Sequence, residues 1–171
     1  MSDELFDVVD SNDNVLRQEL RSVVHRDKLT HRAVHIFVFR TDGRMVIHKR
    51  SDNKEEFPSV WTSSASGHVS AGEDYDETAP RELTEELGIS PALERLQKFA
   101  ACPDTCFEHT VLYRATCDEE LRIDRLEIAA VDTVSLVELQ SRVSSTPDNF
   151  SPAFRLLFDW FMHAERQTPG D

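Results

Sequence analysis

The sequence lacks the features that would place the protein in or across a membrane. It contains no uninterrupted apolar stretch near the roughly 20 residues that a membrane-spanning helix needs. Its N-terminus also lacks the basic and then apolar layout of a signal peptide. We therefore expect a soluble, cytoplasmic protein with no membrane partner.

Cysteines are few. The three cysteines, Cys102, Cys106 and Cys117, include no CxxC pair, and pairing any two would leave one over. Such a set is typical of reduced thiols in a cytosolic chain. The spacing Cys102-x3-Cys106-x2-His109 resembles a metal cluster, but on a strand and a loop we expect these thiols to be buried or unreactive.

Basic residues are also scarce relative to acidic ones. The chain has 19 Lys plus Arg against 32 Asp plus Glu, which gives a formal net charge of −13. Because a strongly acidic surface repels phosphate backbones, binding to a nucleic-acid polymer is disfavoured. A protein of this charge that handles phosphates needs a local cationic group to do so.

The 171 residues have the length and composition of one compact domain, and no repeat, low-complexity tract or linker divides them. We predict a single domain over residues 1–171. The turn sequences Ser11-Asn12-Asp13-Asn14 and Thr41-Asp42-Gly43 predict two hairpins, the first of them an N-terminal extension within residues 1–24. Whether this extension pairs within its own subunit or with a neighbour in a homodimer is left open. Further strands are predicted at 61–68, 96–101, 110–116 and 127–134.

Two segments have helical periodicity. Apolar residues recur every fourth position over 78–87, and Gly88 follows as a natural stop. Pro80 removes a backbone donor, so this helix is predicted to begin late, near Thr78, with Pro80 in the tolerated first turn. Ser151 and Pro152 precede an apolar stripe ending at Phe161 and predict a helix over 151–165 whose stripe belongs to the core, as does Trp61. Strands with a few helices indicate a mixed α/β or α+β sandwich.

The first of these helices carries an unusual cluster of acids. At about 100° per residue, Glu82, Glu85 and Glu86 share an arc of roughly 100°. Carboxylates stacked at these spacings repel one another, and Arg81 alone cannot neutralise three of them together with Glu73. Hard divalent cations prefer carboxylate oxygens, so this face is a candidate magnesium platform for phosphoryl or pyrophosphoryl hydrolysis.

The spacing around the helix is more specific than the cluster alone. Gly67, Glu73 and Arg81-Glu82-Leu83-x-Glu85-Glu86-x-Gly88-Ile89 fill every position of the Nudix box, Gx5Ex7REUxEExGU with U aliphatic. The chain therefore resembles a Nudix hydrolase. The resemblance implies an α/β/α sandwich with a mixed sheet, and Mg²⁺- or Mn²⁺-dependent cleavage of small-molecule diphosphates.

The resemblance also implies roles for the residues of the box. Glu82 and Glu86 would bind the metal, and Glu85 would be a further ligand or the base. Gly67 would lie beside a backbone carbonyl ligand, and Arg81 and Glu73 would brace the element. Gly72 and Gly88 would be structural.

Fragments outside the box resemble one branch of the superfamily, namely type I isopentenyl diphosphate isomerase and its hydrolase-like relatives. They are His31-Arg-Ala-Val-His35, Lys49-Arg50 with Lys54, Phe57-Pro58-Ser-Val-Trp61-Thr62, Ser66-Gly67-His68 and Phe150-Ser151-Pro152. In this register His31 and His68 fall on metal-ligand positions, and Glu108 falls on a glutamate that is both ligand and catalytic acid. Arg50 and Lys54 fall on diphosphate-binding positions, and His25 lies one residue from a third histidine position. These histidines are therefore candidates for a second metal or phosphate site.

Two substitutions depart from the isomerase pattern. Ser66 stands where the isomerases have a cysteine that exchanges a proton with carbon, and Cys106 replaces a second ligand glutamate. Because a hydroxyl has a pKa far above that of a thiol, Ser66 is poorly suited to that step. A diphosphate hydrolase is the favoured interpretation. An isomerase and a ligand-sensing module without turnover are the alternatives.

Overall fold

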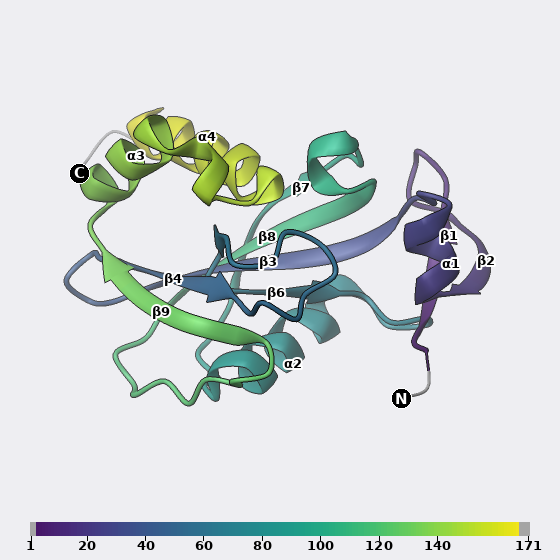
Figure 1. Cartoon of the computed structure of the whole chain (residues 1–171), viewed down its shortest axis with the longest axis horizontal. Helices are drawn as coiled ribbons and strands as arrows, with labels where there is room; N and C mark the ends of the chain where they lie inside the picture. The colour runs from purple at the N-terminus through teal and green to yellow at the C-terminus, as the bar shows by residue number, and fades with distance from the viewer. Residues whose placement is uncertain (1–2, 168–171) are drawn as a thin grey trace.

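The computed structural model describes residues 3–167, and one seven-stranded sheet forms its centre (Figure 1). Residues 1–2 and 168–171 of the predicted 1–171 domain lie outside the described residues. The strands of the sheet are β3 (His31–Phe39), β4 (Met45–Arg50), β5 (Trp61–Thr62), β6 (Ala65–His68), β7 (Glu94–Phe99), β8 (Glu108–Thr116) and β9 (Ile128–Val134). Their order is β5-β4-β3-β8-β7, with β6 paired to β3 and β9 paired to β4. The β3–β8 pair is parallel and the others are antiparallel, so the sheet is mixed.

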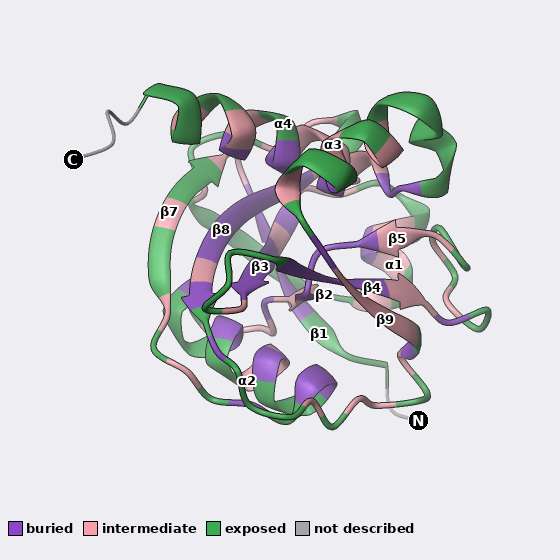
Figure 2. Cartoon of the chain, turned by 90° about the vertical axis from the view of Figure 1, so that its left-hand side faces the viewer, coloured by how far each residue is buried: buried purple, intermediate pink, exposed green. Residues whose placement is uncertain are grey.

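Helices cover both faces of this sheet (Figures 1 and 2). Helix α2 (Tyr75–Leu87) packs Ala79, Leu83 and Leu87 against the sheet in one core cluster. Helices α3 (Leu136–Ser145) and α4 (Pro152–Gln167) lie on the opposite face. There the predicted stripe of α4 is buried against strands β3 and β4, and Trp61 packs beside it. The predicted α/β/α sandwich is confirmed.

The N-terminal segment forms a small sheet of its own. Strands β1 (Leu5–Val9) and β2 (Val15–Leu20) pair antiparallel, which confirms the first hairpin, and helix α1 (Arg21–Arg26) follows. A bridge between Phe6 and Ser70 ties this segment to the loop that precedes α2. Two short 3-10 helices, Pro103–Thr105 and Pro147–Asn149, complete the elements.

Helix α2 begins earlier than predicted. Asp74 accepts a hydrogen bond from the Glu77 backbone at 2.9 Å, and the Glu77 side chain accepts one from the Asp74 backbone at 3.1 Å. This reciprocal capping box fixes the start at Tyr75, so Pro80 lies inside the helix and not in its first turn. The predicted stop is confirmed, since Gly88 adopts the left-handed conformation with φ +66°.

Two helices and one break were not predicted. Helix α1 has six residues and no side-chain cap, so its sequence carries little helical signal. Helix α3 does carry one, because the Ser135 hydroxyl accepts from the Glu138 backbone at 3.2 Å, a cap visible as Ser-x-x-Glu. The extended segment predicted over 61–68 is divided into β5 and β6. Between them, Ser64 bridges Val46 and Val38 through its hydroxyl.

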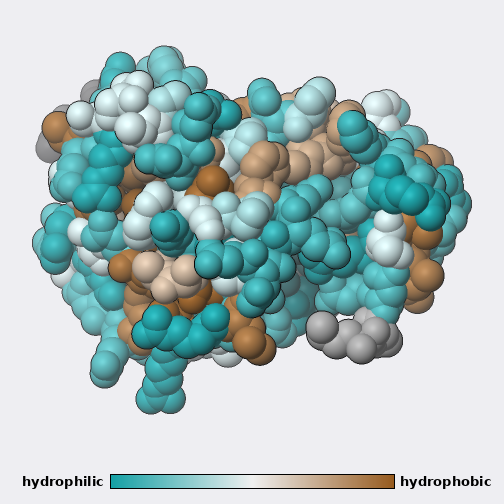
Figure 3. All heavy atoms as spheres, in the orientation of Figure 1, coloured by the Kyte–Doolittle hydropathy of each residue, from teal (hydrophilic) through white to brown (hydrophobic). Residues whose placement is uncertain are grey.

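The molecular surface is hydrophilic on the face that Figure 3 draws, as a chain rich in charged residues predicts. The face shown in Figure 3 is mostly hydrophilic, with hydrophobic residues in small separate groups. No helix in the described part of the chain has the length and apolar character that crossing a lipid bilayer requires.

A buried histidine gives the fold a measurable pH dependence. Burial lowers the pKa of His48, whose Nδ1 lies 2.9 Å from the Ser64 carbonyl oxygen, from 6.5 to about 4. Between these values the unfolded chain binds a proton at this site that the folded chain does not, so stability is lost as pH falls. We expect the stability of the wild type relative to His48→Gln to fall by about 1.4 kcal/mol per pH unit below pH 6.5. Urea unfolding at pH 7.5, 6.0 and 5.0 measures this, with exposed His163→Gln as the control. Parallel curves for wild type and His48→Gln would contradict it.

Candidate active site

A cavity of about 230 Å³ opens over the exposed side of helix α2. Residues 66–68 of strand β6, the acidic residues of α2, and residues from α1 and the loops before β5 and β9 enclose it. Its lining residues are Glu4, Arg21, Lys54, Ser66, Gly67, His68, Arg81, Glu82, Glu85, Glu86, Asp124 and Glu127. The fold thus places the acids of the box and the cationic Lys54 at one opening.

Two of the three helix acids point inward. The Glu86 side chain is buried, and its Oε2 accepts a hydrogen bond from the Ser66 backbone at 3.0 Å. Burial raises the pKa of Glu82 to about 7, and burial together with the charge of Glu82 raises that of Glu86 as well. Glu85 differs, because 58% of its side chain is exposed. The site therefore holds one buried and one largely buried carboxyl whose negative charges are only partly compensated by protein groups.

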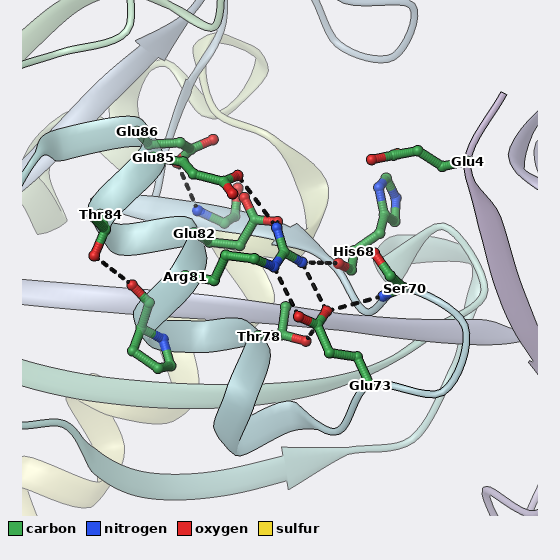
Figure 4. Close-up of polar contacts among 12 residues, drawn as sticks. Glu4, His68, Ser70, Glu73, Thr78, Arg81, Glu82, Thr84, Glu85 and Glu86 are labelled. Carbon is green, nitrogen blue, oxygen red and sulfur yellow. Dashed lines mark hydrogen bonds and ion pairs between the residues drawn. The ribbon is translucent and has the colours of Figure 1, made fainter. Parts of the chain in front are cut away.

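Arg81 organises the surrounding carboxylates (Figure 4). Its Nε and Nη2 each donate to Glu73 at 2.9 Å, a two-point contact that joins the helix to the loop before it. Its Nη1 donates to Glu82 at 2.8 Å and to Glu85 at 3.3 Å. Because Arg81 is already shared among three acids, it neutralises Glu82 only in part and leaves Glu86 without a direct cationic contact of this kind.

The lack of a side chain at Gly67 leaves the space that the Glu82 carboxylate occupies. A Cβ added to Gly67 would lie 2.0 Å from the carboxyl carbon of Glu82, far closer than atoms can approach. The backbone of β6 and the carboxylate of α2 can therefore meet only where no side chain intervenes. Two largely buried carboxyls beside a close-packed backbone segment fit a hard divalent cation such as Mg²⁺, which takes oxygen ligands. Gly72, with φ +81°, lies in the loop between β6 and α2. Its N–H donates to Asp7 of β1 at 3.0 Å and so anchors that loop.

The predicted histidines form a second cluster beside the first. One ring nitrogen from each of His25, His31 and His68 lies within 4.8 Å of the other two. Oε1 of Glu108 lies 3.0 Å from Nε2 of His68 and 3.4 Å from Nε2 of His31. Burial alone would raise the pKa of Glu108, but the two histidines outweigh it and hold that pKa well below its usual range. Three imidazoles and a carboxylate are donors that suit a divalent transition metal.

His68 links the two clusters, since it also lines the cavity with Glu82 and Glu86. His25 belongs to the cluster although it lies one residue from the histidine position of the isomerase pattern. Helix α1 brings its ring to 5.3 Å from that of His31, the first residue of β3. Phe6 from β1 covers the group, with its ring stacked on that of His31 at a centroid distance of 5.7 Å.

The predicted phosphate-binding residues have partners in the structure. Lys54 forms an ion pair with Glu127 at the cavity. Arg50 is bound to the backbone: its Nη2 donates to the Glu56 carbonyl at 2.9 Å and its Nε to the Phe57 carbonyl at 3.1 Å. Arg50 thus holds the loop before β5 as well as lying near the acids.

Several lining residues carried no signal in the sequence. Arg21 begins helix α1, and Glu4 pairs with it at 3.3 Å. Asp124 and Glu127 come from the irregular segment before β9. A lone charged residue far from the box cannot be assigned to a site until the fold brings it there.

The cysteines agree with the prediction of unreactive thiols. Burial raises the pKa of the Cys106 thiol to about 12. The Nε2 atom of the neighbouring His109 lies 2.9 Å from the Asp10 carbonyl oxygen.

Comparisons with known proteins agree with this architecture. Residues 29–156 match the model of the NUDIX domain. The chain is 34% identical over 151 residues to a prenyl-diphosphate phosphatase of Methanosarcina mazei, covering 86% of this chain and 88% of that protein. It is 28% identical over 162 residues to isopentenyl-diphosphate Delta-isomerase 2 of Photorhabdus laumondii, covering 92% of each.

A solved structure gives the same result. The crystal structure of DR0079 from Deinococcus radiodurans superposes with a TM-score of 0.74 at 26% identity, and the match covers 83% of this chain and 90% of that one. Together with the complete box and the carboxylates that it gathers at one cavity, these matches show that the chain belongs to the Nudix family, as an enzyme of the hydrolase type with isopentenyl-diphosphate isomerases among its relatives.

Proposed function

We propose that this protein is a hydrolase dependent on Mg²⁺ or Mn²⁺ that cleaves the diphosphate linkage of a small organic diphosphate. The observation that carries the proposal is the pair of largely buried, partly compensated carboxyls, Glu82 and Glu86, at a cavity that also holds Arg21 and Lys54. A prenyl diphosphate is the favoured substrate class because of the relative named prenyl-diphosphate phosphatase. Nucleoside diphosphate derivatives are the other class.

In this proposal Glu82 and Glu86, with the backbone at Gly67 nearby, hold the metal, and Glu85 is a further ligand or the base. When bound, the metal would neutralise the diphosphate and lower the pKa of a water molecule. Arg21 and Lys54 bind phosphate oxygens, and Lys54 exchanges Glu127 for the substrate as it does so. Arg50 supports these two residues by holding the loop before β5.

The reaction needs one water and one base. The water oxygen bonds to phosphorus, the bridging P–O bond breaks, and the leaving phosphate departs with the bond electrons. A carboxylate of the cavity, from Glu82, Glu85 or Glu86, or that of Glu108 in the neighbouring histidine cluster, accepts the water proton and returns it to solvent. Arg81 and Glu73 keep the helix and loop in register throughout.

A substrate screen tests the proposal. The purified protein is incubated with prenyl diphosphates, nucleoside diphosphate derivatives, sugar nucleotides and coenzymes, with Mg²⁺ or with a chelator, and phosphate-containing products are quantified. We expect turnover of at least one class with Mg²⁺ and loss of turnover with the chelator. Metal-dependent binding without any product would favour the ligand-sensing module instead.

A second candidate function is isopentenyl diphosphate isomerisation. The observation in its favour is the cluster of His25, His31 and His68 with Glu108. Ser66, whose backbone is bound to Glu86, stands against it because a hydroxyl exchanges protons with carbon poorly. NMR of isopentenyl diphosphate with metal-loaded protein decides this: appearance of dimethylallyl diphosphate supports isomerisation, and an unchanged spectrum eliminates it.

A further inference from the structure

The loop between β4 and β5 brings an acidic residue to the histidine cluster from outside. Oε1 of Glu56 lies 3.5 Å from Nδ1 of His25. Glu56 belongs neither to the box nor to any fragment that suggested the isomerase branch. It lines a second cavity, of about 440 Å³, together with His25, His31 and Cys106. The contact therefore needs an explanation of its own.

The inner nitrogens of the cluster are not satisfied by hydrogen bonds. Within residues 3–167, the Nε2 atoms of His25 and His31 are buried and make no hydrogen bond, although the Glu108 carboxylate lies 3.4 Å from that of His31. His31 is 2% exposed, so bulk solvent does not reach its nitrogen. A buried polar atom without a partner costs about 1–3 kcal/mol, and two such atoms in one cluster call for a bound group that accepts their lone pairs.

The outer nitrogens of the same two rings are held. Nδ1 of His31 lies 2.9 Å from the Leu29 carbonyl oxygen, and that of His25 faces the Glu56 carboxylate. A carbonyl or carboxylate oxygen can only accept, so a proton on each Nδ1 satisfies these two contacts and leaves each Nε2 lone pair free for a metal. Metal-binding histidines are commonly oriented in this way by an acceptor on the far nitrogen.

The loop that carries Glu56 is itself fixed in place. Arg50 donates to the carbonyls of Glu56 and Phe57. Phe57 and Ser59 have φ values of +47° and +61°, conformations that non-glycine residues adopt only when the surroundings impose them. Ser59 is bound through its hydroxyl to Asp52. The backbone that carries the Glu56 side chain is thus held by specific contacts.

We propose that Glu56 is a positioning residue for a divalent transition metal held by His25, His31, His68 and Glu108. It fixes His25 in the tautomer and orientation that direct Nε2 to the metal. The inference rests on a metal at the histidine cluster and is independent of whether Glu82 and Glu86 catalyse hydrolysis.

Cobalt titration of the metal-free protein tests this. Binding of Co²⁺ to the histidine cluster produces visible absorption bands, and His31→Ala, which should abolish them, assigns the bands to this site. We expect Glu56→Ala to weaken Co²⁺ affinity by about 10- to 100-fold and to alter the bands. Glu56→Gln, whose amide oxygen can still accept from Nδ1, should recover most of the affinity. Exposed Glu55→Gln is the matched control and should bind as the wild type does.

The tautomer of His25 gives a second readout that needs no metal. Long-range ¹H–¹⁵N NMR of the metal-free wild type should show the proton of His25 on Nδ1, and Glu56→Ala should lose that preference while Glu56→Gln keeps it. Wild-type Co²⁺ affinity and spectrum in Glu56→Ala would overturn the proposal. So would wild-type bands that survive His31→Ala, because the metal would then lie elsewhere. Mg²⁺-dependent product release by the same wild-type preparation shows separately whether the proposed hydrolysis holds.

Discussion

Glu86→Gln is expected to lower Mg²⁺-dependent turnover by about 10³-fold, the scale for loss of a group that acts in the transition state. The substitution keeps the shape of the side chain and an oxygen that can accept from the Ser66 backbone. It removes the negative charge that, in the proposed function, binds the cation. Steady-state kinetics of product release, with the substrate found in the screen, measures the effect.

The same variant should remain folded. Glu86 is buried and its pKa is raised, so the folded state binds this proton more tightly than the unfolded state does, and the ionised carboxylate destabilises the metal-free fold near neutral pH. Glutamine removes that charge, so the metal-free variant should melt no lower than the wild type. Exposed Glu94→Gln on β7 is the matched control for both measurements. Full activity in Glu86→Gln would exclude it from the catalytic machinery.

Gly67→Ala should lower activity by about 10²-fold through a purely steric effect. Its Cβ would overlap the Glu82 carboxyl group, and displacement of a reacting group by about 1 Å costs rates of this order. The φ of Gly67 lies outside the left-handed region, so the backbone itself accepts alanine. The expected signature is therefore lost activity with a modest change in melting temperature.

Gly43→Ala provides the opposite control. Gly43 has φ +84° in the turn between β3 and β4, where a Cβ would meet no atom within 4 Å. Alanine there is strained by about 1–2 kcal/mol without touching the cavity. This variant should lose stability and keep its activity per folded molecule. Equal activity losses in Gly67→Ala and Gly43→Ala would contradict the steric account.

The features that could be predicted from the sequence depend on local chemistry. The Asp-Gly turn, the apolar stripe of α4 and the helix stop at Gly88 each follow from a few neighbouring residues. The box specified the acids of α2 because its spacing places Glu82 and Glu86 on one face of a helix. The branch fragments added the histidines and Glu108.

What the sequence did not reveal depends on contacts between distant segments. Pro80 argued for a late helix start, and the capping box of Asp74 and Glu77 outweighed it. Arg21 reaches the cavity only because the N-terminal hairpin folds back over the loop before α2. Glu56 meets His25 across 31 positions of sequence, and no spacing rule connects two such residues. Neither contact is visible before the sheet and its loops are assembled.

In the proposed function, the acids of α2 are close together because they bind a divalent cation. The most direct test is a Mn²⁺ titration of the metal-free protein followed by electron paramagnetic resonance, with His31→Ala as the background so that only the carboxylate site is counted. One bound Mn²⁺, displaced by Mg²⁺ and absent from the Glu82→Gln/Glu86→Gln variant, is the predicted result. Unchanged Mn²⁺ binding in that double variant, or no binding in the background protein, would contradict the claim.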